Sequence, residues 1–123
     1  MAVTHIDSIR NAMADVVVDS IDVGGAGSLV LRASNNAEVS TLPCSNPAFG
    51  AASGGTATAS AITDDTDATG GTTDRFDFVN GSAAAAGFQG SVGTSGEDIN
   101  LSSVVIGAGD TVSITSLTYT APA

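Results

Sequence analysis

Gly27-Ser28-Leu29-Val30-Leu31-Arg32-Ala33-Ser34 is the stretch that decides the fold of this 123-residue chain. Leu29, Leu31 and Ala33 recur in it at every second position, and a period of two residues is typical of a β-strand. The glycines that precede it, Gly24, Gly25 and Gly27, separate this strand from a segment of different periodicity. The stretch therefore marks residue 28 as the point where a β-domain begins.

Further strands are predicted downstream by the same alternation and by the turn residues between them. Asn35-Asn36 indicates a turn, and Pro43 ends the strand that follows it. Phe76 and Phe78 share one face of a later strand. Together with the first strand, the predicted strands cover residues 28–33, 38–42, 56–61, 74–80, 88–92, 99–105 and 111–119. About seven short strands at this spacing predict a mainly β fold, an antiparallel β-sandwich or jelly-roll-like barrel with one helix attached.

Three local features of the β-domain are also predicted. Residues 81–87, which include four consecutive alanines, are expected to form a loop. Gly107-Ala108-Gly109-Asp110 has the composition of a hairpin turn. In the last strand the apolar residues before and after Thr115-Ser116 fall on opposite faces, so a β-bulge is expected there.

The N-terminal segment is the one predicted helix, over residues 4–23. Apolar residues recur there at spacings of three and four, which indicates an amphipathic helix: Ile6, Ile9, Met13, Val16, Val17 and Ile21. Thr4 is the expected N-cap, with Asp7 three residues later in a variant of the capping box, and Gly24-Gly25 ends the helix. Because Val16-Val17-Val18 lowers intrinsic helicity, this helix is expected to need a partner surface, within the chain or on another protein. The helix and a β-domain over residues 28–121 form a single domain, residues 1–123.

Composition excludes several function classes. Thirteen acidic residues against three arginines and no lysine give a net charge of −10, which disfavours binding to nucleic acid and to anionic membranes. No apolar run approaches the roughly 20 residues that span a bilayer, and no signal peptide is recognised at the N-terminus. Aromatic residues make up 4% of the chain and much of its apolar content is alanine, so the core is thin. A thin core favours stabilisation by oligomerisation over a self-sufficient monomer.

Chemistry-bearing residues are scarce, and the sequence predicts neither catalysis nor a cofactor or metal. His5 is isolated from any nucleophile, and one histidine with one cysteine cannot form a zinc site. Residues 65–70 resemble the start of a calcium loop, but Phe76 stands where the twelfth-position carboxylate is needed, so a solvated acidic turn is the favoured interpretation. Cys44 has no basic neighbour in the sequence and is expected to be a buried, inert thiol.

Several segments resemble a group of small virion proteins encoded among the structural genes of tailed bacteriophages and prophages. The resemblance rests on five segments and the final dipeptide, which together touch most of the chain: Ile9-Arg10-Asn11-Ala12-Met13-Ala14-Asp15, residues 28–33, Asn46-Pro47-Ala48-Phe49-Gly50-Ala51-Ala52, residues 90–96, residues 111–116, and Pro122-Ala123. The helix segment and Asn46-Pro47-Ala48-Phe49-Gly50 are the distinctive ones. Cys44 and the alanine run Ala83-Ala84-Ala85-Ala86 depart from the pattern.

The resemblance implies a structural role in the virion, with assembly in the cytoplasm of the bacterial host. The expected function is capsid decoration: a cement protein on the outer head surface that contacts the major capsid protein or other virion proteins. Closed symmetry favours homo-oligomers, most simply trimers. The candidate protein-contact residues are Ile6, Ile9, Met13, Val17, Leu29 and Leu31, and the alternative for each is a place in the chain's own core.

Two other functions remain open at this stage. A tail-associated structural protein would carry the same resemblance, and only its location in the virion distinguishes it from a decoration protein. An acidic adhesin-like or carbohydrate-binding β-domain would need exposed aromatic residues to stack on sugar rings, and the chain has four phenylalanines, one tyrosine and no tryptophan with which to build such a platform.

Overall fold

The structure is a computed structural model that describes residues 3–122. Helix α1 spans Asp7–Asp19 and continues as a single 3-10 turn, η1, over Ser20–Asp22. The strands are β1 (Ser28–Arg32), β2 (Glu38–Pro43), β3 (Thr56–Thr58), β4 (Gly71–Thr72), β5 (Arg75–Val79), β6 (Ala85–Gly93), β7 (Ile99–Asn100), β8 (Val105–Ile106) and β9 (Thr118–Thr120). The predicted mainly β fold with one N-terminal helix is confirmed.

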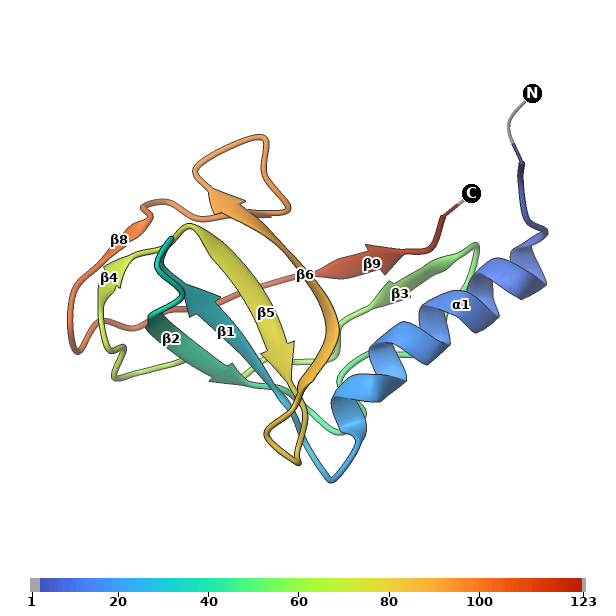
Figure 1. Ribbon diagram of the computed structural model, residues 1–123, viewed down its shortest axis with the longest axis horizontal. Coiled ribbons are helices and arrows are strands. Elements are labelled where there is room, and N and C mark those ends of the chain that lie inside the picture. Colours follow the sequence, from blue (N-terminus) through green and yellow to red (C-terminus); the bar gives the residue numbers. More distant parts are fainter. Residues whose placement is uncertain (1–2, 123) are drawn as a thin grey trace.

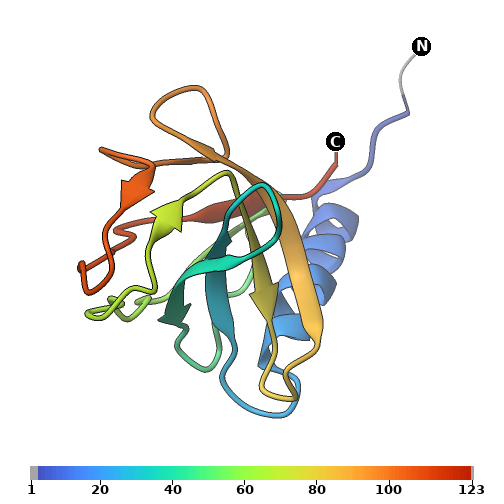
Figure 2. The same ribbon diagram turned by 60° about the vertical axis from the view of Figure 1, so that its left-hand side comes forward.

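One five-stranded sheet and two short ribbons make up the β-structure. The sheet has the order β2-β1-β5-β6-β7 and is antiparallel except for the parallel pairing of β6 with β7. The ribbons are β3-β9 and β4-β8, both antiparallel. The sheet curls, and the segments that carry the two ribbons lie across it (Figures 1 and 2).

Strand β1 lies between two partners, as its apolar character requires. Leu29 is opposite Leu42 of β2 and Phe78 of β5, and both leucines of β1 are fully buried. Val30 points to the other face of the sheet and is also buried, so β1 is covered on both of its faces. The stretch that begins at residue 28 thus forms the middle of the sheet.

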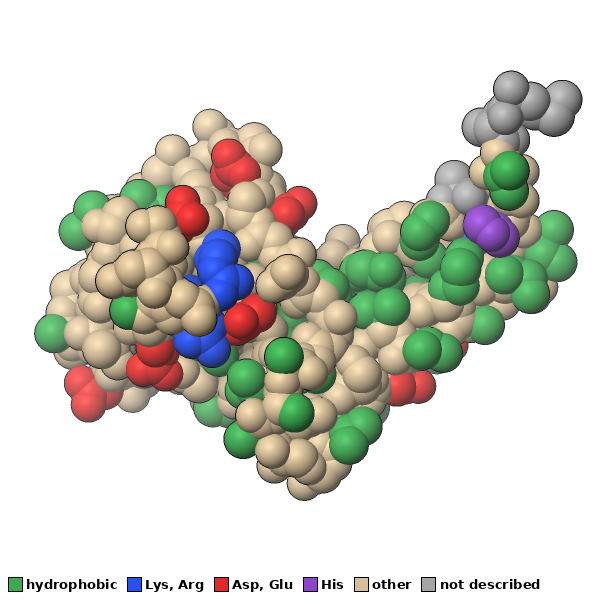
Figure 3. Space-filling view, viewed as in Figure 1, with side chains coloured by type: hydrophobic (Ala, Val, Ile, Leu, Met, Phe, Trp, Pro, Cys, Tyr) green, Lys and Arg blue, Asp and Glu red, His purple; other side chains and the backbone are tan. Residues whose placement is uncertain are grey.

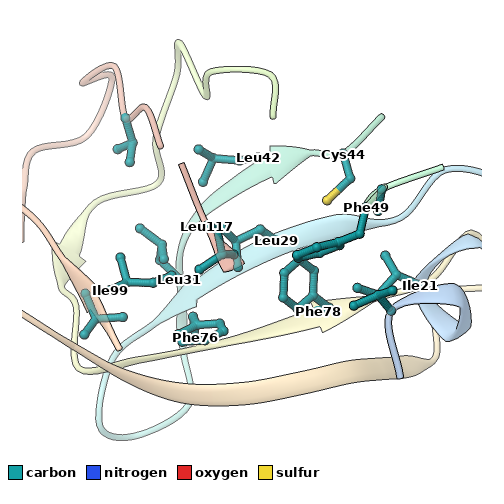
Figure 4. Packing of buried hydrophobic residues seen from close by; sticks show 14 of the residues in the cluster. Ile21, Leu29, Leu31, Leu42, Cys44, Phe49, Phe76, Phe78, Ile99 and Leu117 are labelled. Atoms are coloured by element: carbon teal, nitrogen blue, oxygen red, sulfur yellow. The ribbon is translucent and has the colours of Figure 1, made fainter. Parts of the chain in front are cut away.

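All five aromatic residues of the chain meet in one cluster inside the curled sheet. The ring centroids of Phe78 and Phe88 are 5.0 Å apart, and Phe49 and Phe76 each contact both of these rings at 5.8–6.1 Å. Leucines and isoleucines from β1, β2, β7 and η1 surround the cluster (Figure 4). The few large side chains are therefore concentrated at one place, which compensates for the alanine-rich composition.

Helix α1 lies beside the β-domain and forms an arm with the ribbon β3-β9. It packs against β3, β6 and β9, and both described ends of the chain lie at the far end of this arm (Figure 1). Most of the sheet lies on the other side of the molecule, so one side of the helix is left facing away from the domain.

The predicted start of the helix is wrong. The helix begins at Asp7, three residues after Thr4, and its N-cap is Ile6, which has extended backbone (φ −68°, ψ 157°) and makes no side-chain capping bond. The Ile6 carbonyl accepts the first helical hydrogen bonds, from the N–H groups of Ile9 and Arg10. Thr4 lies outside the helix and cannot serve as its N-cap. The prediction that Gly24-Gly25 ends the helix is confirmed. Both glycines have positive φ, 79° and 120°, in the turn after η1.

The predicted C-terminal strand over 111–119 is also wrong in most of its length. Residues after the turn at 107–110 do not pair back on β8, because β8 pairs with β4 instead. Val112 makes an isolated bridge with Asp65, and only Thr118–Thr120 forms a strand, with β3 as its partner. The expected bulge at Thr115-Ser116 has no strand to interrupt. The register shifts of the sheet lie between Leu31 and Arg32 and between Phe76 and Phe78.

Two alanine-rich segments differ from expectation in opposite ways. The expected loop over 81–87 is a tight turn followed at Ala85 by β6, so two of its four alanines are in a strand. The expected strand over 56–61 is reduced to β3, after which Ala59 and Ile62 make only isolated bridges with Phe49 and Cys44. Alanine favours neither element strongly, so the neighbouring strands decide.

Candidate interaction surface on helix α1

Polar side chains dock helix α1 onto the β-domain. Asn11 Oδ1 accepts a hydrogen bond of 2.7 Å from the N–H of Gly55, and Asp15 Oδ1 accepts one of 2.9 Å from the N–H of Ala52. In η1, Asp22 Oδ1 accepts a bond of 2.9 Å from the N–H of Ala48. These three acceptors satisfy backbone donors in the irregular segment between β2 and β3, which would otherwise lack partners.

Arg10 joins the helix to the end of the chain. Its guanidinium donates to the carbonyl oxygens of Gly54, Ala121 and Pro122, each at 3.3 Å. The side chain is only 20% exposed and also lies 3.8 Å from the carboxylate of Asp7. The guanidinium is thus oriented toward the chain's own carbonyls and holds the C-terminal segment against the helix.

The apolar part of the docked side is small. Ala14, Val18 and Ile21 are at most 1% exposed, and they are the buried residues of α1 and η1. Ser20 adds a polar contact on the same side of the helix: its Oγ accepts a 2.7 Å hydrogen bond from the N–H of Gly87 in β6. The side of the helix that contacts its own domain is therefore largely polar.

The opposite side of α1 is apolar and exposed. Ile6 is 70% exposed, Ile9 47% and Val16 73%, and Met13 lies among them half-buried. Val3, in the extended segment before the helix, is 83% exposed. Hydrophobic side chains gather along the arm that carries α1, whereas the acidic side chains of this view lie mostly on the β-domain (Figure 3). Helix α1 therefore also exposes apolar side chains on the side away from its domain, where a surface helix usually carries polar ones.

The six predicted contact residues divide into two groups. Ile6 and Ile9 are on the exposed side, Met13 is half-buried between Ile9 and Val16, and Val17 is half-buried at the margin of this side. Leu29 and Leu31 are fully buried between β2 and β5 and cannot contact a partner in the folded chain, which corrects their assignment. Sequence reasoning missed Val16, although its spacing of three from Met13 and seven from Ile9 places it on the same side.

The acidic loop has a structural role that its composition did not reveal. Asp65 accepts hydrogen bonds from the hydroxyl of Ser40 (2.7 Å) and from the N–H groups of Thr41 and Asp67 (3.0 Å each). Burial raises the pKa of Asp65, but these three bonds outweigh it, so that the pKa is lower than its ordinary value of 3.8. Among residues 3–122 no group of three or more His, Cys, Asp or Glu side chains is placed to hold a metal ion.

Replacing Asp65 by Ala should lower the free energy of unfolding by about 1–3 kcal/mol at pH 7, because the buried hydroxyl of Ser40 loses its acceptor. A lowered native pKa stabilises the fold above the unfolded value near 3.9, and this stabilisation is lost as the pH falls below it. The difference between wild type and variant should thus shrink below pH 4 in urea titrations. The exposed neighbour Asp64, replaced by Ala, serves as the control. Equal effects of the two substitutions would contradict this role.

Cys44 is buried beside β1, as expected from the sequence. Burial raises the pKa of its thiol to about 11, and the nearby negative charge of Asp22 adds to the effect. Compared with the ordinary value of 9.0, this reduces the thiolate fraction by about 100-fold near pH 8. A disulfide reagent should therefore react at least that much more slowly with the folded chain than with the urea-unfolded chain. Equal rates in the two states would show that the thiol is accessible.

No protein-family model, curated protein or solved structure matches this chain. Within the described residues, no helix is long and apolar enough to span a membrane. Any functional argument therefore depends on the surface of α1, on the distribution of charge and on the resemblance seen in the sequence.

Proposed function

We propose that this chain is a bacteriophage virion protein that decorates the outer surface of the capsid head and stabilises the shell through protein–protein contacts. The observation that carries the proposal is the exposed apolar side of α1, which the chain does not use for its own fold. The helix is held on its other side, by hydrogen bonds of Arg10, Asn11, Asp15 and Asp22 and by the burial of Ala14, Val18 and Ile21.

The exposed side of α1 has the properties of a binding surface for protein. Contiguous apolar side chains rimmed by polar ones mark interaction sites on soluble proteins. Burying a fully exposed valine or isoleucine contributes about 1.5–3 kcal/mol, so Ile6, Ile9 and Val16 together could supply several kcal/mol to an interface. Because the helix is already folded and docked, binding does not have to order it.

The arrangement of the arginines supports a position away from packaged DNA. Arg32 pairs with Asp77 at 3.0 Å, and Arg75 lies 3.9 Å from the same carboxylate. Arg10 is directed at backbone carbonyls. With no lysine in the sequence and all three arginines turned toward acceptors of the same chain, this protein of net charge −10 leaves no arginine side chain directed outward to bind a phosphate.

The resemblance to small virion proteins of tailed bacteriophages supports the placement in a virion, and the acidic character supports the outer surface of the head. Mass spectrometry of virions separated into heads and tails tests the proposal. The chain is expected in the head fraction, where antibodies against it should label intact particles. Its presence only in tails would favour the tail-associated alternative, and its absence from both fractions would contradict a virion role.

The carbohydrate-binding alternative gains little from the structure. Phe88 and Tyr119 line a groove of about 290 Å³ between β6 and β9, together with Gln89 and Asp98. Their rings, however, pack on each other with centroids 4.9 Å apart and planes tilted by 34°. A sugar-binding platform needs an aromatic face open to the ligand, and these two half-buried rings pack against each other and against the core cluster.

A further inference from the structure

Residues 113–117 have a sequence that predicts a strand, but they have no strand as a partner. They run without a turn or bend from the bridge between Val112 and Asp65 to strand β9. Within the described part of the chain, none of the N–H groups of residues 113–117 donates a hydrogen bond to a backbone carbonyl. Most backbone groups of folded proteins are paired, so this segment is open to pairing with another chain.

Strand β9, which follows this segment, has an open edge as well. Among the described strands β9 pairs only with β3. The carbonyl of Leu117, just before β9, accepts a hydrogen bond from the N–H of Ala59, just after β3. The main-chain groups of successive residues in a strand point to opposite edges, so those of Ser116 and Thr118 point away from β3.

A groove runs along this open edge. One part of it, of about 290 Å³, lies between β6 and β9, and the other, of about 280 Å³, lies between β7 and residues 113–117. Asp98 and Leu117 line both parts, and we call the two together the edge groove. On its other side β7 is the last strand of the five-stranded sheet and pairs with β6 only at Val92 and Gly93. Both sides of the edge groove therefore carry strand edges that no other described strand covers.

The shape of the edge groove fits an extended chain better than a compact ligand. Each part is slightly smaller than the roughly 300–1,000 Å³ of pockets that enclose a small molecule, and the two parts follow each other along residues 113–120. A segment of this length spans about 26 Å when extended. An extended peptide can pair with the open backbone groups along it, which is the recognition mode called β-strand addition.

Charge favours a basic peptide in the edge groove. Among the described residues that line the groove, Asp98 is the only charged one. Its Oδ2 accepts hydrogen bonds from the N–H (3.1 Å) and the hydroxyl (3.3 Å) of Ser91, whereas its Oδ1 accepts none within the described part of the chain. The carboxylate can therefore receive a cation as well. The net charge of −10 attracts a basic partner and repels further copies of this acidic chain.

We propose that the edge groove binds an extended, basic peptide segment of another protein. The segment adds as a strand beside β9 and residues 113–117, its main chain pairs with theirs, and one of its lysines or arginines meets Asp98. Phe88 and Tyr119 supply an apolar contact at one end of the groove. The inference goes beyond the proposed function, because the edge groove shares no residue with the exposed side of α1 and its test requires no virion.

Nuclear magnetic resonance titration of the full chain with a synthetic probe tests the proposal, up to about 1 mM peptide. The probe is an acetylated and amidated heptapeptide of alternating threonine and valine with a lysine at its centre. It should shift the amide resonances of residues 113–120 and slow the hydrogen exchange of residues 113–117 by at least about tenfold. The same peptide with methylated backbone nitrogens cannot donate hydrogen bonds and should not bind. Failure of the lysine peptide to bind, or equal binding of the methylated one, overturns the proposal.

Two charge variants test the place of the cation. With the wild-type chain, a glutamate at the centre of the probe should weaken binding by at least about fivefold relative to lysine, because an exposed ion pair is replaced by repulsion. Asp98→Asn should remove most of this preference. Asp64→Asn makes the same change in net charge at an exposed carboxylate outside the groove and should keep the preference. An equal preference in the two variants contradicts the role of Asp98.

Ser116→Pro tests the backbone pairing from the side of the protein. Ser116 is exposed and its N–H donates to no backbone carbonyl of the described chain, so proline removes a donor that the fold does not use. A variant with the circular dichroism of wild type should bind the lysine peptide at least about tenfold more weakly. Binding as tight as that of wild type would contradict strand addition. The methylated peptide makes the same test without changing the protein.

Discussion

Replacing Phe78 by Ala should lower the free energy of unfolding by about 3–5 kcal/mol. Phe78 is fully buried, and its ring contacts those of Phe49, Phe76 and Phe88. Few other large side chains exist in this chain to fill the cavity, because all its aromatic residues already belong to this one cluster. Small domains are stable by about 5–15 kcal/mol, so the loss would remove a large part of the total.

Urea unfolding followed by far-ultraviolet circular dichroism measures this loss, since the chain has no tryptophan to report by fluorescence. Val105→Ala is the control, because this exposed valine of β8 should change the stability by less than about 0.5 kcal/mol. If Phe78→Ala were as mild as the control, the aromatic cluster would not be the centre of the core.

Strands β1, β2 and β5 could be predicted from the sequence because their signals are local. Residues 28–32, 38–43 and 75–79 are strands of five or six residues with clear alternation or clear turn residues at their ends. Their apolar residues are the large ones, so the buried face is unambiguous. In such segments local preference and tertiary packing agree.

The C-terminal third could not be predicted because its strands are two or three residues long and their partners are distant. Strand β9 pairs with β3, about 60 residues earlier, and β8 pairs with β4 across more than 30 residues. A strand of two residues has no period that a sequence can display. The path of residues 111–117 follows instead from bridges such as that between Asp65 and Val112.

For helix α1, the sequence predicts which residues share an apolar side but not what that side contacts. The apolar spacing located the helix, but spacing cannot tell whether an apolar side faces the chain's own core or a partner. The orientation of α1 depends on backbone N–H groups in the segment between β2 and β3. These groups require hydrogen-bond acceptors, which Asn11, Asp15 and Asp22 provide. The positions of those donors depend on tertiary structure and leave no trace in the helix sequence.

The claim most central to this account is that α1 turns its apolar side outward, and two substitutions in one turn of the helix test it most directly. Val16 is 73% exposed and Val18 is 1% exposed. Both lie in the last turn, so replacing either by Asp carries the same intrinsic helix cost and the same unfavourable interaction with the helix dipole, about 0.3–1 kcal/mol.

The measurement is the free energy of unfolding of the two variants, at a protein concentration low enough that the wild type is monomeric. Val18→Asp places a carboxylate in the core and should cost more than about 3 kcal/mol or prevent folding. Val16→Asp should cost no more than about 1 kcal/mol, the amount that its place in the helix explains. If instead Val16→Asp destabilised the monomer as strongly as Val18→Asp, the apolar side of α1 would belong to the chain's own core, and the interaction surface would not exist.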